Sequence, residues 1–187
     1  MPAKILTAYA PGGEYRPEHV DRLRAQCAEH APGVPFVCVT SKWPGWWCKI
    51  DTLRVEGPVL YMDLDTSIVG GIAPLLNAAA QHRFIALKNP YPEPSLFGSG
   101  LMGWNGDMSH VYARFAQDPQ THMARCKTKK RWGDQGFISE DEPDPVFWQD
   151  LCPNQIVSWK VDCAEGVPKK ARVIYFHGKP RPWDIGM

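Results

Sequence analysis

Short apolar runs alternate with an amphipathic segment in the first part of the chain. Residues 4–10 and residues 34–40 are rich in apolar side chains and have the length of strands. Residues 17–31, between them, carry apolar side chains at helical spacing, and Pro17 suits the first turn of a helix. A strand, a helix and a strand in this order predict a parallel βαβ unit with a right-handed crossover.

The rest of the chain continues this alternation. We expect helices at 46–55, 73–81, 109–117 and 134–139, and strands at 59–66, 83–87, 100–104, 155–159 and 172–177. A proline-rich loop is expected at 88–96. The 187 residues are enough for one domain with a core of its own. The pattern therefore predicts a single α/β domain over residues 1–187, in which helices flank a mostly parallel, Rossmann-like sheet.

The most informative segment is the predicted strand at 59–66, because it ends in two carboxylates one residue apart, Asp63 and Asp65. Ionised carboxylates are rarely buried without a partner. Two of them at the end of a buried strand favour a hard divalent cation, with substrate phosphates as its further ligands. The alternative is that one aspartate caps the next turn and the other is solvated.

Composition narrows the functional classes. The formal net charge of +1 favours neither a nucleic-acid nor a membrane-surface partner. No apolar run approaches the roughly 20 residues that a spanning helix needs. The six cysteines are scattered without a CxxC motif, and the first residues carry no signal-peptide pattern, which favours reduced thiols. We expect a cytoplasmic protein without a transmembrane segment.

Other polar groups also follow predicted strands, where open α/β sheets bind their ligands. Ser99, the pair Asp134 and Gln135, and His177 lie in such loops. His177 comes directly after an apolar strand and could add a nitrogen ligand to the same metal. The alternative is that His177 is a hydrogen-bonded surface residue, which is the commoner role of a lone histidine in this position.

Basic residues could balance the charge of a diphosphate. Lys49, Lys179 and Arg181 are the candidates, although solvated surface cations are the commoner fate of these residue types. A dense basic run at 125–131 precedes Asp134. We interpret this run as a solvated loop, and the alternative hypothesis is a flap that closes over the diphosphate.

Five segments of the chain resemble, in the same order, motifs of nucleotide-sugar-dependent glycosyltransferases with the A-type fold. The similarity is to the group of glycogenin and the bacterial lipopolysaccharide galactosyltransferases (family 8), and it spans most of the chain. The segments are WCKI at 47–50 with Arg54, YMDLDT at 61–66, FGSGLM at 97–102, GDQG at 133–136 and FHGKPRPW at 176–183.

This resemblance implies transfer of a sugar from a nucleotide-diphosphate donor, expected to be a UDP-sugar. The acceptor would be a glycan, a lipid-linked sugar or a protein. The resemblance also implies Mn²⁺ or Mg²⁺ held by Asp63, Asp65 and His177, acting as a Lewis acid on the donor. Lys49 and Lys179 would stabilise the negative charge that grows on the leaving nucleoside diphosphate.

Further roles follow from the same resemblance. Thr7, Ala8 and Tyr9 would line the nucleotide base and ribose. Asp134 and Gln135 would form the catalytic pair that faces the sugar and the reaction centre. The remaining donor contacts would come from Leu64, Ser99, Gly100 and Gly178.

The chain departs from the family pattern in two places. Gly98 stands where the family usually has asparagine, so one polar contact to the donor sugar is missing or replaced. The closing motif is also compressed, with Gly178 directly after His177 and Arg181 in place of a lysine. The sequence therefore leaves open whether Lys179 or Arg181 meets the diphosphate, and whether the reaction retains stereochemistry.

Two other functions fit parts of the pattern. Phosphatases of the haloacid dehalogenase type also carry Asp-x-Asp after a buried strand, with the first aspartate as nucleophile. They usually carry it near the amino terminus, whereas Asp63 lies a third of the way along this chain. A nucleotide-sugar-binding protein without transferase activity is the other alternative, because a fold alone does not establish a reaction.

Overall fold

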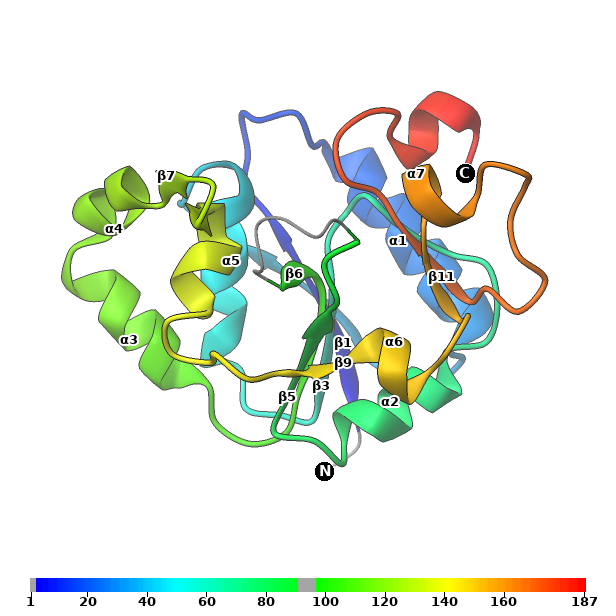
Figure 1. Cartoon of the computed structure of the whole chain (residues 1–187), viewed down its shortest axis with the longest axis horizontal. Helices are drawn as coiled ribbons and strands as arrows, with labels where there is room; N and C mark the ends of the chain where they lie inside the picture. Colours follow the sequence, from blue (N-terminus) through cyan, green and yellow to red (C-terminus); the bar gives the residue numbers. More distant parts are fainter. Residues whose placement is uncertain (1–2, 91–96) are drawn as a thin grey trace.

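The computed structural model describes residues 3–90 and 97–187, and its central element is a six-stranded sheet (Figure 1). β1 pairs in parallel with β2 and β3, whereas β6 pairs antiparallel with β3 and β5, and β5 pairs in parallel with β9. β6 therefore runs against the other strands of this sheet, and the prediction of a mostly parallel sheet is confirmed. In spatial order the strands are β2 (Phe36–Thr40), β1 (Lys4–Tyr9), β3 (Val59–Met62), β6 (Gly98–Trp104), β5 (Phe84–Leu87) and β9 (Val146–Phe147).

A smaller sheet lies beside the central one and consists of β10 (Ile156–Ser158), β11 (Val173–Tyr175) and β4 (Thr66–Ile68). Because β3 belongs to the central sheet and β4 to the smaller one, the chain passes between the sheets at Asp63–Asp65. The prediction of one strand over 59–66 is wrong on this point. The backbone N–H of Thr66 donates to the carbonyl of Asp63 at 3.0 Å, which closes a turn and places both carboxylates outside the strands.

Helices cover both faces of the central sheet, as expected from the sequence (Figure 1). Ile5 and Leu60 pack in a cluster with α1 and α2, while Leu6 and Tyr61 pack in a second cluster with η1 and α3. Neighbouring strand residues thus point to opposite cores, as the pleat requires. The helices are α1 (Pro17–His30), the 3₁₀ helix η1 (Gly45–Arg54), α2 (Ala73–Ala79), α3 (Ser109–Gln117), α4 (Pro119–Arg125), α5 (Gly133–Ile138), α6 (Trp148–Leu151), α7 (Trp159–Asp162) and the 3₁₀ helix η2 (Pro182–Ile185).

Several short elements differ from the sequence expectations. The basic run at 125–131 ends α4 and continues into a hairpin formed by β7 (Lys127–Thr128) and β8 (Arg131–Trp132). The strand expected at 155–159 stops at Ser158, whose hydroxyl accepts a hydrogen bond from the backbone N–H of Val161 and caps α7. Most of the proline-rich loop expected at 88–96 lies outside the described residues.

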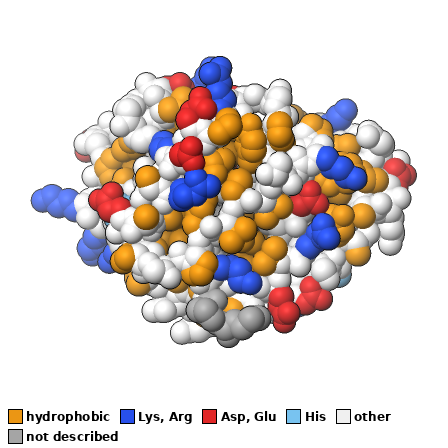
Figure 2. Space-filling model, turned by 180° about the vertical axis from the view of Figure 1, so that it is seen from behind, with side chains coloured by type: hydrophobic (Ala, Val, Ile, Leu, Met, Phe, Trp, Pro, Cys, Tyr) orange, Lys and Arg blue, Asp and Glu red, His pale blue; other side chains and the backbone are white. Residues whose placement is uncertain are grey.

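The surface and the length of the helices complete this description. On the face seen from behind in Figure 2, lysine, arginine, aspartate and glutamate side chains are interspersed among hydrophobic ones. Within the described residues, no helix combines the length and the apolar character that a bilayer span requires.

We predict that Gly103→Val destabilises the fold. A Cβ atom at Gly103 on β6 would lie 2.7 Å from Cζ2 of Trp148, the first residue of α6, which is fully buried against the sheet. Overpacking of this kind costs about 1–3 kcal/mol, measured as the free energy of urea unfolding. Gly71→Ala is the control, because a Cβ there meets Arg172 at an ordinary 3.6 Å. Equal stability of the two variants would contradict the packing described here.

Candidate functional site

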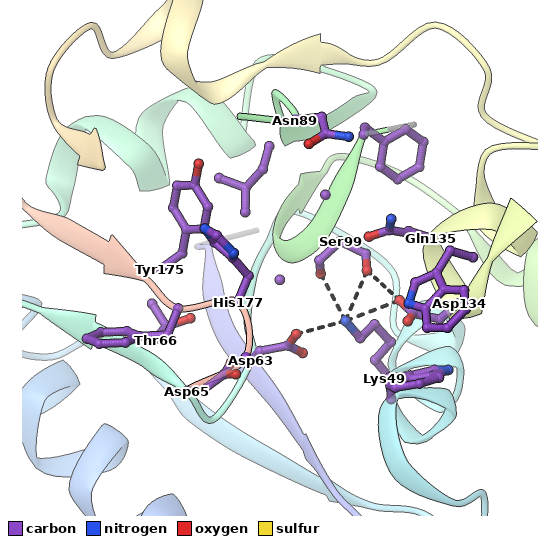
Figure 3. A pocket seen from close by; sticks show the side chains of 18 of the residues that line it. Lys49, Asp63, Asp65, Thr66, Asn89, Ser99, Asp134, Gln135, Tyr175 and His177 are labelled. Carbon is purple, nitrogen blue, oxygen red and sulfur yellow. Dashed lines mark hydrogen bonds and ion pairs between the residues drawn. The ribbon is translucent and has the colours of Figure 1, made fainter. Parts of the chain in front are cut away.

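A cavity of about 570 Å³ opens where the Asp63–Asp65 turn meets the ends of β11 and β6 and the first turn of α5 (Figure 3). This is the edge of the sheet at which open α/β folds bind ligands. The cavity brings together most of the side chains that the sequence singled out. They are Lys49, Asp63, Asp65, Ser99, Gly100, Asp134, Gln135, His177 and Gly178.

The floor of the cavity is organised by the ammonium group of Lys49, which η1 presents to three other segments (Figure 3). Its Nζ atom lies 2.9 Å from Oδ2 of Asp63 and 3.1 Å from Oδ2 of Asp134. It also donates to the hydroxyl and carbonyl oxygens of Ser99, at 3.1 and 3.2 Å. Ser99 in turn donates from its hydroxyl to Asp134. Only 2% of the Lys49 side chain is exposed, so the ammonium is held inside the protein.

The charges of this cluster shift one another's protonation equilibria. Burial alone would lower the pKa of Lys49, but the carboxylates of Asp134 and Asp63 raise it above its ordinary value. Burial raises the pKa of Asp134, although Lys49 acts in the opposite direction. A lysine that stays charged beside two carboxylates is the arrangement that makes their burial tolerable.

Asp65 is held by a second basic group. Arg181 donates to Oδ2 of Asp65, and the hydroxyl of Tyr15 donates to the same atom at 2.9 Å. The Arg181 guanidinium also contacts Glu14 at 2.8 Å. Burial and the nearby charge of Asp63 raise the pKa of Asp65 to about 6. The carboxylates of Asp63 and Asp65 therefore repel each other on this turn, and the charge of Arg181 offsets only part of that repulsion.

Arg22 on α1 holds the backbone of the Asp63–Asp65 turn by hydrogen bonds. Its Nη2 atom donates to the carbonyl oxygens of Leu64 at 2.7 Å and Thr66 at 2.8 Å, and its Nη1 atom to the hydroxyl of Ser67 at 3.1 Å. Sequence reasoning missed this residue, together with Tyr15 and Glu14. No signal marked Arg22, because an arginine on the polar side of a helix is normally solvated.

A second cavity of about 230 Å³ adjoins the first and shares Tyr15, Trp46, Asp63 and Arg181 with it. Its lining includes Ala8 at the end of β1 and Leu64 of the turn. Ala8 and Leu64, both expected at the donor, therefore lie in a cavity next to the carboxylates.

Three of the expected site residues line neither cavity: Thr7, Tyr9 and Lys179. Thr7 is fully buried within β1. β1 sends alternate side chains to opposite faces, which separates Thr7 and Tyr9 from Ala8. The roles expected for these three residues stay predictions.

His177 lies at the cavity, and its Nε2 atom is 2.8 Å from the hydroxyl oxygen of Ser158. Within residues 3–90 and 97–187, no group of three or more His, Cys, Asp or Glu side chains is placed to hold a metal ion. Asp63 and Asp65 do fit a hard cation, since they offer carboxylate oxygens on a turn with crowded negative charge. His177 is not gathered with them into a three-ligand site.

The fold is that of glycosyltransferases. The chain superposes on the apo-form glycosyltransferase GlyE of Streptococcus pneumoniae TIGR4 with a TM-score of 0.66 and 10% identity, covering 98% of this chain and 56% of GlyE. A glycosyltransferase involved in the glycosylation of the major capsid of PBCV-1 matches with a TM-score of 0.62 and 14% identity, covering 99% of both chains. The bifunctional glycosyltransferase WbbM matches with a TM-score of 0.55 and 12% identity, over 97% of this chain and 46% of WbbM.

The chain thus spans about half the length of GlyE and WbbM, and almost all of the PBCV-1 enzyme. No protein-family model matches the sequence, and neither does any curated protein. The comparisons consequently establish a glycosyltransferase fold, and the resemblance to family 8 stays a prediction.

We predict that Lys49→Met lowers the free energy of unfolding by about 3–5 kcal/mol, because it leaves Asp63 and Asp134 without their shared cation. Urea denaturation measures the loss. Lys88→Met is the matched control, since Lys88 pairs with Asp150 at the surface, where both side chains are more than half exposed. That change should cost less than about 1 kcal/mol. Similar costs for the two variants would contradict the central role of Lys49.

Proposed function

We propose that the chain is a glycosyltransferase that takes a nucleotide-diphosphate sugar, most simply a UDP-sugar, as its donor. The observation that carries the proposal is the Asp63–Asp65 turn, which lines two adjoining cavities in a glycosyltransferase fold. The smaller cavity, with Ala8, suits the nucleoside. The larger one, with Asp134 and Gln135, suits the sugar and the site of transfer.

Mn²⁺ or Mg²⁺ would be held by Asp63 and Asp65, and when bound it would neutralise charge on the donor diphosphate. The protein's own residues supply the rest. Arg181 lines both cavities and carries the guanidinium that stands nearest to Asp65. We assign it to the diphosphate, where negative charge grows as the sugar departs.

For Lys49 we propose a positioning role, while the contact with the leaving group that the sequence led us to expect stays a prediction. Because its ammonium is buried among Asp63, Ser99 and Asp134, it acts as a positioning residue that fixes two carboxylates in the cavity wall. Asp134 and Gln135 lie next to each other at the start of α5 and face the larger cavity. They are the side chains that we assign to the reaction centre.

The phosphatase alternative receives less support from the same geometry. A nucleophilic Asp63 needs a carboxylate oxygen that is open to attack a phosphorus atom. Here Oδ2 of Asp63 accepts from Lys49, and Oδ1 accepts from the hydroxyl of Tyr61 at 2.6 Å. Each hydrogen bond lowers the nucleophilicity of the oxygen that accepts it, whereas the second lone pair of each oxygen stays available to a cation.

Isothermal titration with a panel of nucleoside diphosphates, with and without Mn²⁺, tests the proposal. We predict that one diphosphate binds more tightly with Mn²⁺, and that Asp65→Ala removes this metal-dependent gain while the thermal unfolding transition persists. Asp144→Ala is the control, because Asp144 is exposed and lies outside both cavities. Absence of binding to every diphosphate would overturn the proposal. Binding without sugar transfer or hydrolysis would favour the non-catalytic binding protein.

A second prediction separates the two candidate diphosphate contacts. Arg181→Ala should weaken binding of the preferred nucleoside diphosphate by about tenfold or more, since one charge-assisted contact contributes about 1.5–3 kcal/mol. Lys179→Ala should change the affinity by less than about threefold, because Lys179 lines neither cavity. The reverse order of effects in the same titration would assign the contact to Lys179.

A further inference from the structure

Two tryptophans stand exposed at the rim of the larger cavity. Trp46 on η1 and Trp132 on β8 are each 50% exposed, whereas Trp47, Trp104 and Trp148 are buried. The ring centroids of Trp46 and Trp132 are 6.1 Å apart, with planes inclined at 43°, and both residues line the cavity. Indole rings have a large apolar area, and a pair left open to solvent at a cavity points to a ligand surface.

The pair is fixed in place by two glycines of α5. A Cβ atom at Gly133 would lie 2.9 Å from Nε1 of Trp46, so the indole of Trp46 packs directly on the glycine backbone. Gly133 also adopts a φ of +59°, a conformation that favours glycine. A Cβ atom at Gly136 would lie 2.6 Å from the carbonyl carbon of Arg131, so the hairpin strand that carries Trp132 is pressed against the helix. The Trp46 ring and the backbone that carries Trp132 are therefore held in position before a ligand arrives.

The surroundings of the rings narrow the chemistry of that ligand. Lys129 from the hairpin and Gln135 from α5 line the same cavity as the indoles and offer hydrogen-bond donors there. An apolar ring face beside convergent polar groups matches a sugar ring, which presents polarised C–H groups on its face and hydroxyls around its edge. A lipid chain would make no use of the hydrogen-bond donors of Lys129 and Gln135.

We propose that Trp46 and Trp132 form the acceptor platform, on which a pyranose ring of a carbohydrate acceptor stacks. The inference rests on the proposed glycosyltransferase function and adds the class of acceptor to it. Position supports the assignment, because Trp132 precedes Asp134 by two residues and Trp46 lines the nucleoside cavity as well as the larger one. A sugar on the platform lies beside both the donor and the side chains assigned to the reaction centre.

The test is a titration of the protein, saturated with its preferred nucleoside diphosphate, with a panel of methyl pyranosides and disaccharides, followed by tryptophan fluorescence. We expect at least one sugar to change the emission saturably. Trp132→Ala should weaken that sugar's binding by about two- to twelvefold, since an aromatic contact contributes about 0.5–1.5 kcal/mol. Trp132→Phe keeps a ring at this position and should retain most of the affinity.

A control readout separates a platform from a general disturbance. Nucleoside diphosphate affinity should stay within about twofold of the wild type in Trp132→Ala and Trp132→Phe, because Trp132 does not line the nucleoside cavity. The inference is overturned if no sugar in the panel binds, or if Trp132→Ala binds sugars as the wild type does. Sugar binding by a wild type that binds no nucleoside diphosphate would instead overturn the proposed function and leave a carbohydrate-binding surface.

Discussion

The candidate site depends on one buried cation. Lys49 on η1 is bound to three other segments, namely the Asp63–Asp65 turn, β6 at Ser99 and α5 at Asp134. Burying the Asp134 carboxylate beside the partly exposed Asp63 would be costly without an opposite charge, and the ammonium supplies that charge at hydrogen-bonding distance from both. The position of each carboxylate in the cavity is therefore set by the same nitrogen atom.

The two aspartates of the turn have different surroundings as a result. Asp63 is committed to Lys49 and Tyr61, whereas Asp65 is bound by Arg181, which follows β11, and by Tyr15, which follows β1. Arg181 also holds Glu14, so the segment after β11 is tied by ion pairs to both the turn and the loop after β1. A ligand with a negative diphosphate would meet Arg181 at the junction of the two cavities, where it could exchange carboxylate contacts for phosphate ones.

The sequence was sufficient for the main elements and for much of the polar lining of the larger cavity, because strand and helix periodicity and the strand-end rule are local signals. Asp63, Asp65, Ser99, Asp134 and His177 were all found in this way. The sequence did not predict that the strand expected at 59–66 is divided at Asp63. This division follows from the pairing of β4 with β11, which lies more than a hundred residues further along the chain. The sequence did not predict Arg22 and Glu14 as part of the site for a similar reason: their partners are distant in the chain, and polar side chains carry no periodic pattern.

The same helix, α5, connects the carboxylate cluster to the tryptophan pair. Its first turn carries Asp134 toward Lys49, and its glycines let Trp46 and the hairpin pack closely. Its far end is held by Arg114, which donates to the carbonyl oxygen of Phe137 at 2.8 Å and pairs with Asp141 at 2.8 Å. Because α5 is anchored by an ion pair at its first turn and by a hydrogen bond from Arg114 at its last, the distance between the carboxylates and the indole rings is set by the fold. Such fixed spacing is what a site needs to align two sugars for transfer, since reacting groups must be held within a fraction of an ångström of their productive geometry.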